Sequence, residues 1–390
     1  MLSVAEALTR VLALMRPVGV ARVALADAGG RVLAEPVTAA RDQPPFAASA
    51  MDGYAVRAAD ATHGSALRVI GEAPAGRAWT GTLGPGEAVR IFTGAPMPQG
   101  ADAVLIQENA DRDGDALRVR EAPAPGAWLR PRGLDFAAGA QLAAPRRLSP
   151  ADIALAAAMN AAELVVRRRP VVALIPTGDE LAQPGAVPGP DQIIASSGYG
   201  VAALLAQYGA APRLAPIARD SVDSLRAALD AAAGADLIVT LGGASVGDYD
   251  LVREVADALD FYRVAIRPGK PLMAGRVGAT PLVGLPGNPV SAMVCGHVFL
   301  RPALDAMLGL PAGPLPRVRA RLAQDMAAGG PREHYMRAAL GPDGVAPFAD
   351  QDSSVQSLMA QADALIVQPP DAPAAQAGEM VEIIPLRGTC

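Results

Sequence analysis

From residue 171 onward, short apolar runs alternate with segments of helical length, and this alternation limits the possible folds more than any other feature of the chain. Short apolar strands separated by helices are typical of βαβ crossovers and of a mostly parallel sheet, which binds ligands at the carboxyl ends of its strands. The sequence therefore predicts a doubly wound α/β domain. Its strands are expected at 171–175, 213–218, 237–241, 264–266, 272–274 and 282–285, and its helices at about 198–208, 221–233, 249–259 and 289–308.

The rest of the 390 residues is predicted to form smaller domains. A helical pattern opens the chain and stops at Pro17, and Ser149, Pro150 and Asp152 are typical of a helix start. Residues 41–130 and 317–390 instead contain short β runs between Gly and Pro turns. We therefore expect a multidomain α/β plus β protein. Its predicted parts are an elongated N-terminal α+β domain (1–40 and 131–166), an inserted β domain (41–130), the α/β domain (167–309) and a small C-terminal β domain (312–390).

Charge and composition exclude several classes of protein. The net charge is -5 and the only basic cluster, 167–169, is interpreted as a solvated lead-in to a strand, so we expect no nucleic-acid binding. We find no signal peptide and no apolar run of about 20 residues, so the protein is expected in the cytoplasm rather than in a membrane. Cys295 and Cys390, with three scattered histidines, are too few for a disulfide framework or a Cys/His metal site. Any metal is expected to be held by oxygen.

The basic residues are unusual in kind. Of the 34, all but Lys270 are arginine. A compact ammonium group is not interchangeable with a planar guanidinium group. Lys270 is therefore a candidate for a site at which the shape of the cation matters.

Four loops follow apolar strands of the predicted sheet, at 176–181, 219–221, 241–250 and 284–289. The last two are rich in glycine, which lets backbone amides approach phosphate oxygens. Glu180, Asp220 and Asp250 are expected to meet across the same crevice, where carboxylates repel one another unless a hard cation lies between them. We interpret this as Mg²⁺ bridging carboxylates and phosphate. The simpler alternatives are plain turn geometry for each loop and a helix N-cap for Asp220.

Other candidates favour structural roles. Gly198 and Gly200 fall inside a predicted helix, so they do not form a dinucleotide-binding turn. Cys295 is expected to be an inert core thiol, and His297 has no obvious partner. The glycines and prolines of 49–55 and 91–98 are explained by turn chemistry.

Taken together, these segments resemble the molybdopterin molybdenumtransferase family, which includes MoeA and the gephyrin E domain. The resemblance covers nearly the whole chain. It rests on SAMDGYA at 49–55, RIFTGAPMPQGADAV at 90–104, RGLD at 132–135, PTGDEL at 176–181, GGASVGDYD at 242–250, RPGKP at 267–271 and GLPGNPVSA at 284–292.

The resemblance implies an enzyme of molybdenum cofactor biosynthesis. Such an enzyme takes adenylylated molybdopterin and molybdate as substrates, cleaves the phosphoanhydride with a divalent cation and releases AMP. It also implies an elongated homodimer, with the site between the α/β molybdopterin-binding domain of one subunit and the β domains of the other. Molybdopterin adenylyltransferase and molybdoenzyme chaperones are further implied partners.

Site residues follow by motif. The resemblance makes Glu180, Asp220 and Asp250 the functional acids and metal ligands of the α/β domain, with Asp52, Thr93 and Asp135 facing them. Asp52 and Asp135 complete the implied catalytic set. The implied binding residues are Thr93, Thr177, Gly178, Asp179, Gly242, Gly243, Ser245, Arg263, Arg267, Lys270, Pro286, Gly287, Asn288, Pro289 and Ser353.

The chain departs from the family pattern at several positions. Arg263 and Arg267 stand where many members have lysine, and 195–197 reads Ala-Ser-Ser where Asp-Ser-Asn is usual. Leu134 stands where an acid often precedes the aspartate matched by Asp135. An alternative is therefore a paralogue that binds the cofactor or a partner, for storage or as a scaffold, without turnover. A third possibility, nucleotidyl transfer by the α/β domain, leaves the flanking β domains without a purpose.

Overall fold

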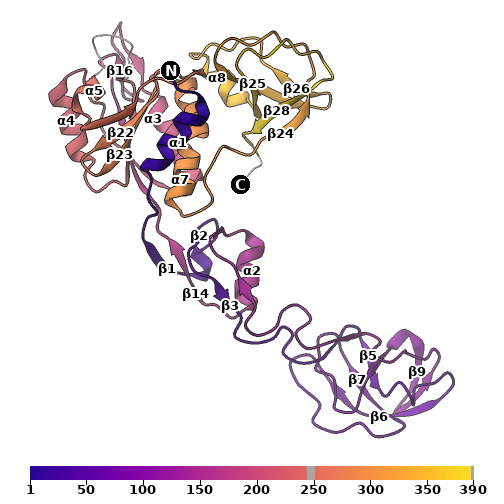
Figure 1. Ribbon diagram of the computed structural model, residues 1–390. Coiled ribbons are helices and arrows are strands. Elements are labelled where there is room, and N and C mark those ends of the chain that lie inside the picture. Colours follow the sequence, from indigo (N-terminus) through magenta and orange to yellow (C-terminus); the bar gives the residue numbers. More distant parts are fainter. Residues whose placement is uncertain (244–250, 388–390) are drawn as a thin grey trace.

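The chain forms an elongated molecule in the computed structural model, which describes residues 1–243 and 251–387 (Figure 1). An α/β unit and a C-terminal β unit lie at one end of the molecule, a distal β unit lies at the other, and a narrow middle unit connects them (Figure 1). The middle unit is crossed twice by the chain, on the way to the distal unit and on the way back.

The α/β unit contains the predicted, mostly parallel sheet. Its strand order is β18-β15-β19-β23-β22-β20, in which β18, β15, β19 and β23 are parallel and β22 pairs antiparallel with both β23 and β20. The strands are β15 (Val171–Pro176), β18 (Ala211–Leu214), β19 (Leu237–Leu241), β20 (Ala258–Phe261), β22 (Met273–Val277) and β23 (Thr280–Leu285). The helices are α3 (Ser197–Gln207), α4 (Val222–Ala231), α5 (Leu251–Val255), α6 (Pro289–Cys295) and α7 (Arg301–Met307), with the π-helical η3 (Gly296–Leu300) between α6 and α7; the short pair β16 (Leu181–Ala182) and β17 (Ile193–Ile194) precedes α3.

Three sequence predictions for this unit are wrong. The helix expected at 249–259 ends at Val255, and β20 follows it as an antiparallel edge strand. The strand expected at 264–266 is β21 (Ile266–Arg267), which pairs with a strand of the C-terminal unit instead of joining the α/β sheet. The strand expected at 213–218 is displaced and ends at Leu214. Runs of two to four residues do not resolve a helical period from a strand period, so these errors fall on the shortest elements.

The N-terminal helix α1 (Val4–Leu14) packs in the core of the α/β unit. Ser3 and Glu6 form a capping box at its start, and Val4, Leu8 and Val11 are buried in one cluster with residues of the sheet and of α7. The helix therefore packs with the α/β unit rather than with the strands that follow it in sequence.

The middle unit pairs segments from both passes of the chain. Its main sheet has the order β1-β14-β2-β13, and its helix α2 begins with the predicted N-cap Ser149, first-turn Pro150 and capping acid Asp152. The elements are β1 (Val20–Ala24), η1 (Leu25–Asp27), β2 (Val32–Leu33), β3 (Val37–Thr38), β12 (Gln141–Leu142), β13 (Arg146–Arg147), α2 (Pro150–Ala158) and β14 (Glu163–Arg167).

The two remaining units are β-rich, as the sequence predicts. The distal sheet has the order β8-β5-β7-β6-β10-β9, and the C-terminal sheet the order β21-β25-β27-β28-β24, with β26 beside β25. The distal elements are β4 (Ala48–Ser49), β5 (Gly53–Val56), β6 (Ala66–Ala73), β7 (Glu87–Ile91), β8 (Ala103–Ile106), η2 (Gln107–Asn109), β9 (Ala110–Asp113), β10 (Ala116–Val119) and β11 (Leu129–Arg130). The C-terminal elements are β24 (Val318–Arg321), β25 (Glu333–Gly341), β26 (Gly344–Pro347), α8 (Gln356–Gln361), β27 (Ala364–Gln368) and β28 (Met380–Pro385).

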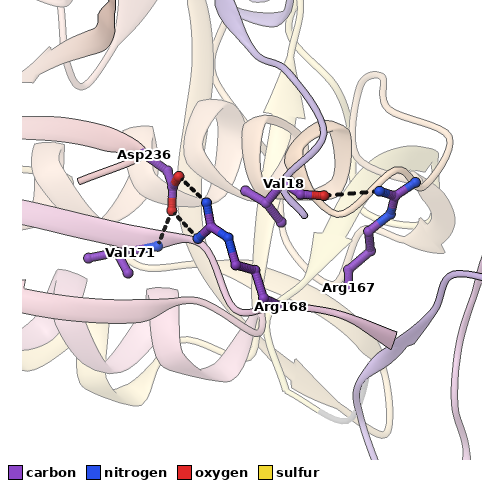
Figure 2. Close-up of polar contacts among 5 residues, drawn as sticks. All are labelled: Val18, Arg167, Arg168, Val171 and Asp236. Carbon is purple, nitrogen blue, oxygen red and sulfur yellow. Dashed lines mark hydrogen bonds and ion pairs between the residues drawn. The ribbon is translucent and has the colours of Figure 1, made fainter. Parts of the chain in front are cut away.

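The arginines at 167–169 are more than a solvated lead-in to β15. Arg168 forms a two-pronged ion pair with Asp236, at 2.6 and 2.5 Å, and the same carboxylate accepts the amide of Val171 at 2.8 Å (Figure 2). Arg167 donates to the carbonyl of Val18 at 2.9 Å (Figure 2). These contacts fasten the chain where it enters the α/β unit, and they correct the sequence interpretation.

Cys295 and His297 both lie inside the core. Cys295 is fully buried and burial raises the pKa of its thiol, so the prediction of an inert core thiol is confirmed. His297, for which the sequence offered no partner, lies 2.7 Å from the hydroxyl of Tyr208 through Nδ1. Burial lowers the pKa of His297 to about 4, so the ring is neutral at physiological pH.

Candidate functional site

A cavity of about 680 Å³ lies at the carboxyl ends of the central parallel strands, where a doubly wound sheet is expected to bind its ligand. It is lined by Pro176 at the end of β15, by Leu241 at the end of β19 and by Pro286 directly after β23. The turns after these strands therefore form the floor of one pocket.

Two predicted acids, Glu180 and Asp220, line this cavity and are exposed to solvent. The turn of Asp220 is held by paired contacts with Asp179: each backbone amide donates to the other residue's carboxylate at 3.3 Å. The simpler interpretation of Asp220 as a helix cap is wrong, because Ser221 caps α4 by accepting the amide of Ser224. The carboxylate of Asp220 is thus left at the cavity.

The glycine turn after β19 is shaped by a close approach to Thr177. Gly242 and Gly243 have φ values of +92° and +67°, and a Cβ on Gly242 would lie 2.7 Å from the carbonyl oxygen of Thr177. Thr177 in turn donates its amide and its hydroxyl to the carbonyl of Leu241, at 2.9 and 3.3 Å. Only glycine fits Gly242, because both its backbone conformation and its surroundings exclude a side chain.

The cationic side chains of the cavity come from two units. Arg267 and Lys270 lie on the segment that contains β21, and Arg332 precedes β25, with which β21 pairs. Arg332 also donates to the carbonyl of Ile266 at 3.3 Å. The strand pairing between the units thus gathers three positive charges at one wall.

The C-terminal unit completes this wall with polar residues. The cavity is lined here by Gln351, Asp352 and Ser353. The hydroxyl of Ser353 accepts a hydrogen bond from Nδ2 of Asn288 at 2.9 Å. The carbonyl of Ser353 accepts the amide of Val290 at 3.3 Å. Pro286, Gly287, Asn288 and Pro289 all line the cavity as well. The loop before α6 is therefore fixed to the C-terminal unit.

Comparison with known proteins agrees with this arrangement. Three family models match in order along the chain: the MoeA N-terminal region (domains I and II) at residues 2–160, a probable molybdopterin binding domain at 173–306, and the MoeA C-terminal region (domain IV) at 319–386. A molybdopterin molybdenumtransferase 2 of Mycobacterium tuberculosis is 38% identical, with 98% of this chain and 99% of that protein aligned. The chain belongs to the MoeA family of molybdopterin molybdenumtransferases.

Further relatives support the MoeA assignment over the whole length. A molybdopterin molybdenumtransferase of a Nostoc species is 38% identical over 88% of this chain and 83% of its own length. A crystal structure of a molybdopterin biosynthesis MoeA protein from Pyrococcus horikoshii is 30% identical, covers both chains completely and superposes with a TM-score of 0.84. The multidomain fold predicted from the sequence is thus the MoeA fold.

Most of the implied binding residues lie at this MoeA cavity, and some do not. Those that line it are Thr177, Gly178, Gly242, Gly243, Arg267, Lys270, Pro286, Gly287, Asn288, Pro289 and Ser353. Asp179 is next to it through Asp220. Arg263 does not line it: its Nε is buried, and its guanidinium group lies over the ring of Tyr262 at 4.7 Å. Ser245 and Asp250 lie outside the described residues.

The three residues implied to face the cavity from the other domains, Asp52, Thr93 and Asp135, do not reach it within one chain. Asp52 and Thr93 belong to the distal unit, where the Asp52 carboxylate accepts the amide and the hydroxyl of Thr93 at 2.7 and 2.8 Å. These bonds hold the pKa of Asp52 below its ordinary value. Asp135 lies where the chain returns to the middle unit, and its amide donates to the carbonyl of Gln43. None of the three lines the cavity.

Sequence reasoning missed several residues of the cavity, of which Arg332 and Asp352 are charged. Both belong to the C-terminal unit. The pairing of β21 with β25 brings Arg332 to the site, and Asp352 precedes Ser353, which the family motif had already implied. Ala195 and Ser197, the two positions where this segment departs from the family pattern, also line it. Ser197 donates to the carbonyl of Gly287 at 3.2 Å, so this replacement keeps a polar contact across the cavity.

The acids suit a hard cation that also binds phosphate. Within residues 1–243 and 251–387 no group of three or more His, Cys, Asp or Glu side chains is placed to hold a metal ion. Glu180 and Asp220 nevertheless line one pocket with their carboxylates exposed. Mg²⁺ is usually held by one or two carboxylates together with substrate phosphates and water, so the donor set fits this ion.

Within residues 1–243 and 251–387, no helix is long and apolar enough to cross a bilayer.

Proposed function

We propose that this chain inserts molybdenum from molybdate into adenylylated molybdopterin, with cleavage of the phosphoanhydride and release of AMP. One observation carries the proposal: Glu180 and Asp220 line the same cavity as the cations Arg267, Lys270 and Arg332, in a member of this family. A reaction between an adenylylated substrate and molybdate requires carboxylates that hold a divalent cation and cationic side chains that bind oxyanions, both in one pocket.

Glu180 and Asp220 would hold Mg²⁺ through their carboxylates, and the motif implies Asp250 as a third ligand. When bound, Mg²⁺ supplies charge neutralisation and polarisation at the phosphoanhydride. The paired amides and carboxylates of Asp179 and Asp220 keep this turn in place. Gly242 lets the chain pass close to Thr177, so that phosphate can approach backbone amides.

The cationic wall would bind molybdate or phosphate. Arg267 and Arg332 would offer forked donors and Lys270, the only lysine of the chain, a compact charge. The Ser353 hydroxyl accepts from Asn288, so its own hydrogen is available for an oxyanion.

A direct assay tests the reaction. Purified protein is given adenylylated molybdopterin, molybdate and Mg²⁺, and AMP release is measured. Glu180→Gln should abolish AMP release while the protein stays folded. The matched control is Glu163→Gln, which neutralises an exposed carboxylate of β14 far from the cavity and should leave the rate unchanged. Full AMP release by Glu180→Gln would contradict the assignment, and tight retention of the substrate by the wild type without turnover would favour the binding paralogue.

We also propose that the complete site needs two chains, because Asp52, Thr93 and Asp135 lie outside the cavity of their own chain. Mixing Glu180→Gln subunits with Asp52→Ala subunits tests this arrangement. If the distal unit serves the other subunit's cavity, half of the dimers are mixed and one of their two sites is intact. Activity should then return to about a quarter of the wild-type value after subunit exchange. If each chain serves its own cavity, no activity returns.

A further inference from the structure

A second cavity, of about 150 Å³, lies at the joint between the middle unit and the α/β unit. Gly30, Arg31 and Arg147 line it from the middle unit, Gln207 and Gly209 line it from the end of α3, and Arg169 lines it from the connection into β15. It shares no lining residue with the larger cavity. We call it the joint cavity.

Among the described residues that line the joint cavity there are three arginines and no acid. Arg147 is already occupied: it forms an ion pair with Asp305 at 3.2 Å and donates to the carbonyls of Tyr208 and Gly30 at 3.2 and 3.4 Å. Gly209, with φ +96°, allows this approach, since a Cβ there would lie 3.2 Å from Nη1 of Arg147. Arg147 therefore acts as a fixed part of the joint.

Arg31 and Arg169 are left with unmatched charge. Arg31 donates through Nη2 to the carbonyl of Arg167 at 2.9 Å, and neither Arg31 nor Arg169 forms an ion pair with any residue that the structure describes. Burial, together with the positive charge of Arg169, lowers the pKa of Arg31. Two guanidinium groups that line one cavity repel each other, and an anion between them would offset this repulsion.

Size limits what the anion is. The volume of about 150 Å³ is well below the roughly 300–1,000 Å³ of sites for drug-sized ligands. An inorganic ion fits this volume, whereas a nucleotide or a pterin would extend well beyond the cavity. Guanidinium groups match the oxygens of tetrahedral oxyanions through paired N–H donors.

We propose that the joint cavity binds a tetrahedral oxyanion of the sulfate, phosphate or molybdate type between Arg31 and Arg169. The bound ion joins the middle unit to the α/β unit. Because the distal unit is attached only through the middle unit in the described chain, the ion also helps to set the position of the distal unit (Figure 1).

The full-length protein is titrated with sulfate, phosphate or molybdate at constant ionic strength, and Tm and heat of binding are measured. The wild type should be stabilised as its site fills. Arg31→Gln/Arg169→Gln should lose the part of the rise in Tm and of the heat that comes from the joint cavity, with affinity there weaker by about tenfold or more, while oxyanion binding at the cationic wall remains. Arg226→Gln, at an exposed position of α4, is the matched control and should respond like the wild type. The relative affinities of the joint cavity for the three ions identify the natural ligand. Tightest binding of molybdate would indicate the substrate anion, and tightest binding of sulfate or phosphate would indicate a common cellular ion.

Two further measurements make the test decisive. Without oxyanion, Arg169→Gln should be at least as stable as the wild type, because the repulsion between the two arginines is gone while the bond from Arg31 to the carbonyl of Arg167 is kept. Arg169→Gln alone, at an exposed position, replaces the double variant if that protein does not fold. Crystals soaked in selenate should show selenium at the joint cavity. An unchanged Tm response in the variants, or selenium at the larger cavity alone, would overturn the proposal.

Discussion

Replacing Gly242 by alanine should damage the cavity floor by two separable effects. The residue has φ +92°, and a non-glycine residue in the left-handed region costs about 1–2 kcal/mol. Its new Cβ would lie 2.7 Å from the carbonyl oxygen and 2.9 Å from the hydroxyl of Thr177, and relieving such an overlap costs about 1–3 kcal/mol. We therefore expect Gly242→Ala to destabilise the α/β unit by about 2–5 kcal/mol.

Two other glycines of the same unit separate these effects. Gly234 has φ +77° but nothing within 4 Å of its Cβ position, so Gly234→Ala should cost only the backbone term of about 1–2 kcal/mol. Gly287 is outside the left-handed region, and its Cβ would meet only Gly242 at 3.5 Å, an ordinary contact. Gly287→Ala should be close to neutral, helped by about 0.4–1 kcal/mol from the stiffer unfolded chain.

The assay must read the α/β unit by itself, because a multidomain chain does not unfold in one step. Hydrogen exchange of the β15 and β19 amides under mild denaturant gives the local opening free energy. The expected order of stability loss is Gly242→Ala, then Gly234→Ala, then Gly287→Ala. Equal losses for Gly242→Ala and Gly234→Ala would refute the argument that contact with Thr177 restricts this turn.

Three further predictions concern contacts away from the cavity floor. In a double-mutant cycle of Arg168→Gln and Asp236→Asn, the coupling free energy should be about 1 kcal/mol, since Arg168 is 42% exposed and solvent weakens the ion pair. Purely additive effects would show that the ion pair does not stabilise the fold. The pKa of His297 in the folded protein is about 4, below its ordinary 6.5. Its contribution to stability is therefore complete above pH 6.5 and falls by about 3 kcal/mol as the pH is lowered toward 4. The free energy of unfolding by urea should depend less on pH in His297→Asn than in the wild type. Asn288→Ala and Ser353→Ala should each lower the opening free energy of the loop before α6, measured by hydrogen exchange, by about 1 kcal/mol. The double variant should lower it little further, and full additivity of the two effects would argue against their hydrogen bond.

The sequence predicted the parts of this fold that depend on long local patterns. The apolar runs of β15, β19 and β23 are mostly buried, and helices α3 and α4, which lie between β15 and β19, span about three turns each, so their periods are unambiguous. The start of α2 was predicted to the residue, because Ser149 and Asp152 bond to each other's amides across one turn. Each of these features is decided within about ten residues of sequence.

The errors occurred where a contact across the chain decides the structure. Ile266 has the apolar character of an α/β strand but pairs with Glu333, which is 67 residues further on. Arg332 reaches the cavity only because of that pairing, and no local pattern marks it. Arg263 carries the same charge as Arg267 four residues away, yet it packs against Tyr262 outside the cavity. The family motif implied Asp52 and Thr93 as site residues, but neither the motif nor the spacing predicted the hydrogen bond between them.

The cationic wall depends on two units at once. β21 is covalently part of the α/β unit but lies in the C-terminal sheet, so the segment with Arg267 and Lys270 is fixed by both. Arg332 and Ser353 add bonds from the C-terminal unit, to the carbonyl of Ile266 and to the loop before α6. A doubly wound sheet alone leaves the carboxyl ends of its strands open to solvent. The C-terminal unit closes that end, and a displacement of this unit would therefore move the cations relative to Glu180 and Asp220 even if the α/β sheet stayed unchanged.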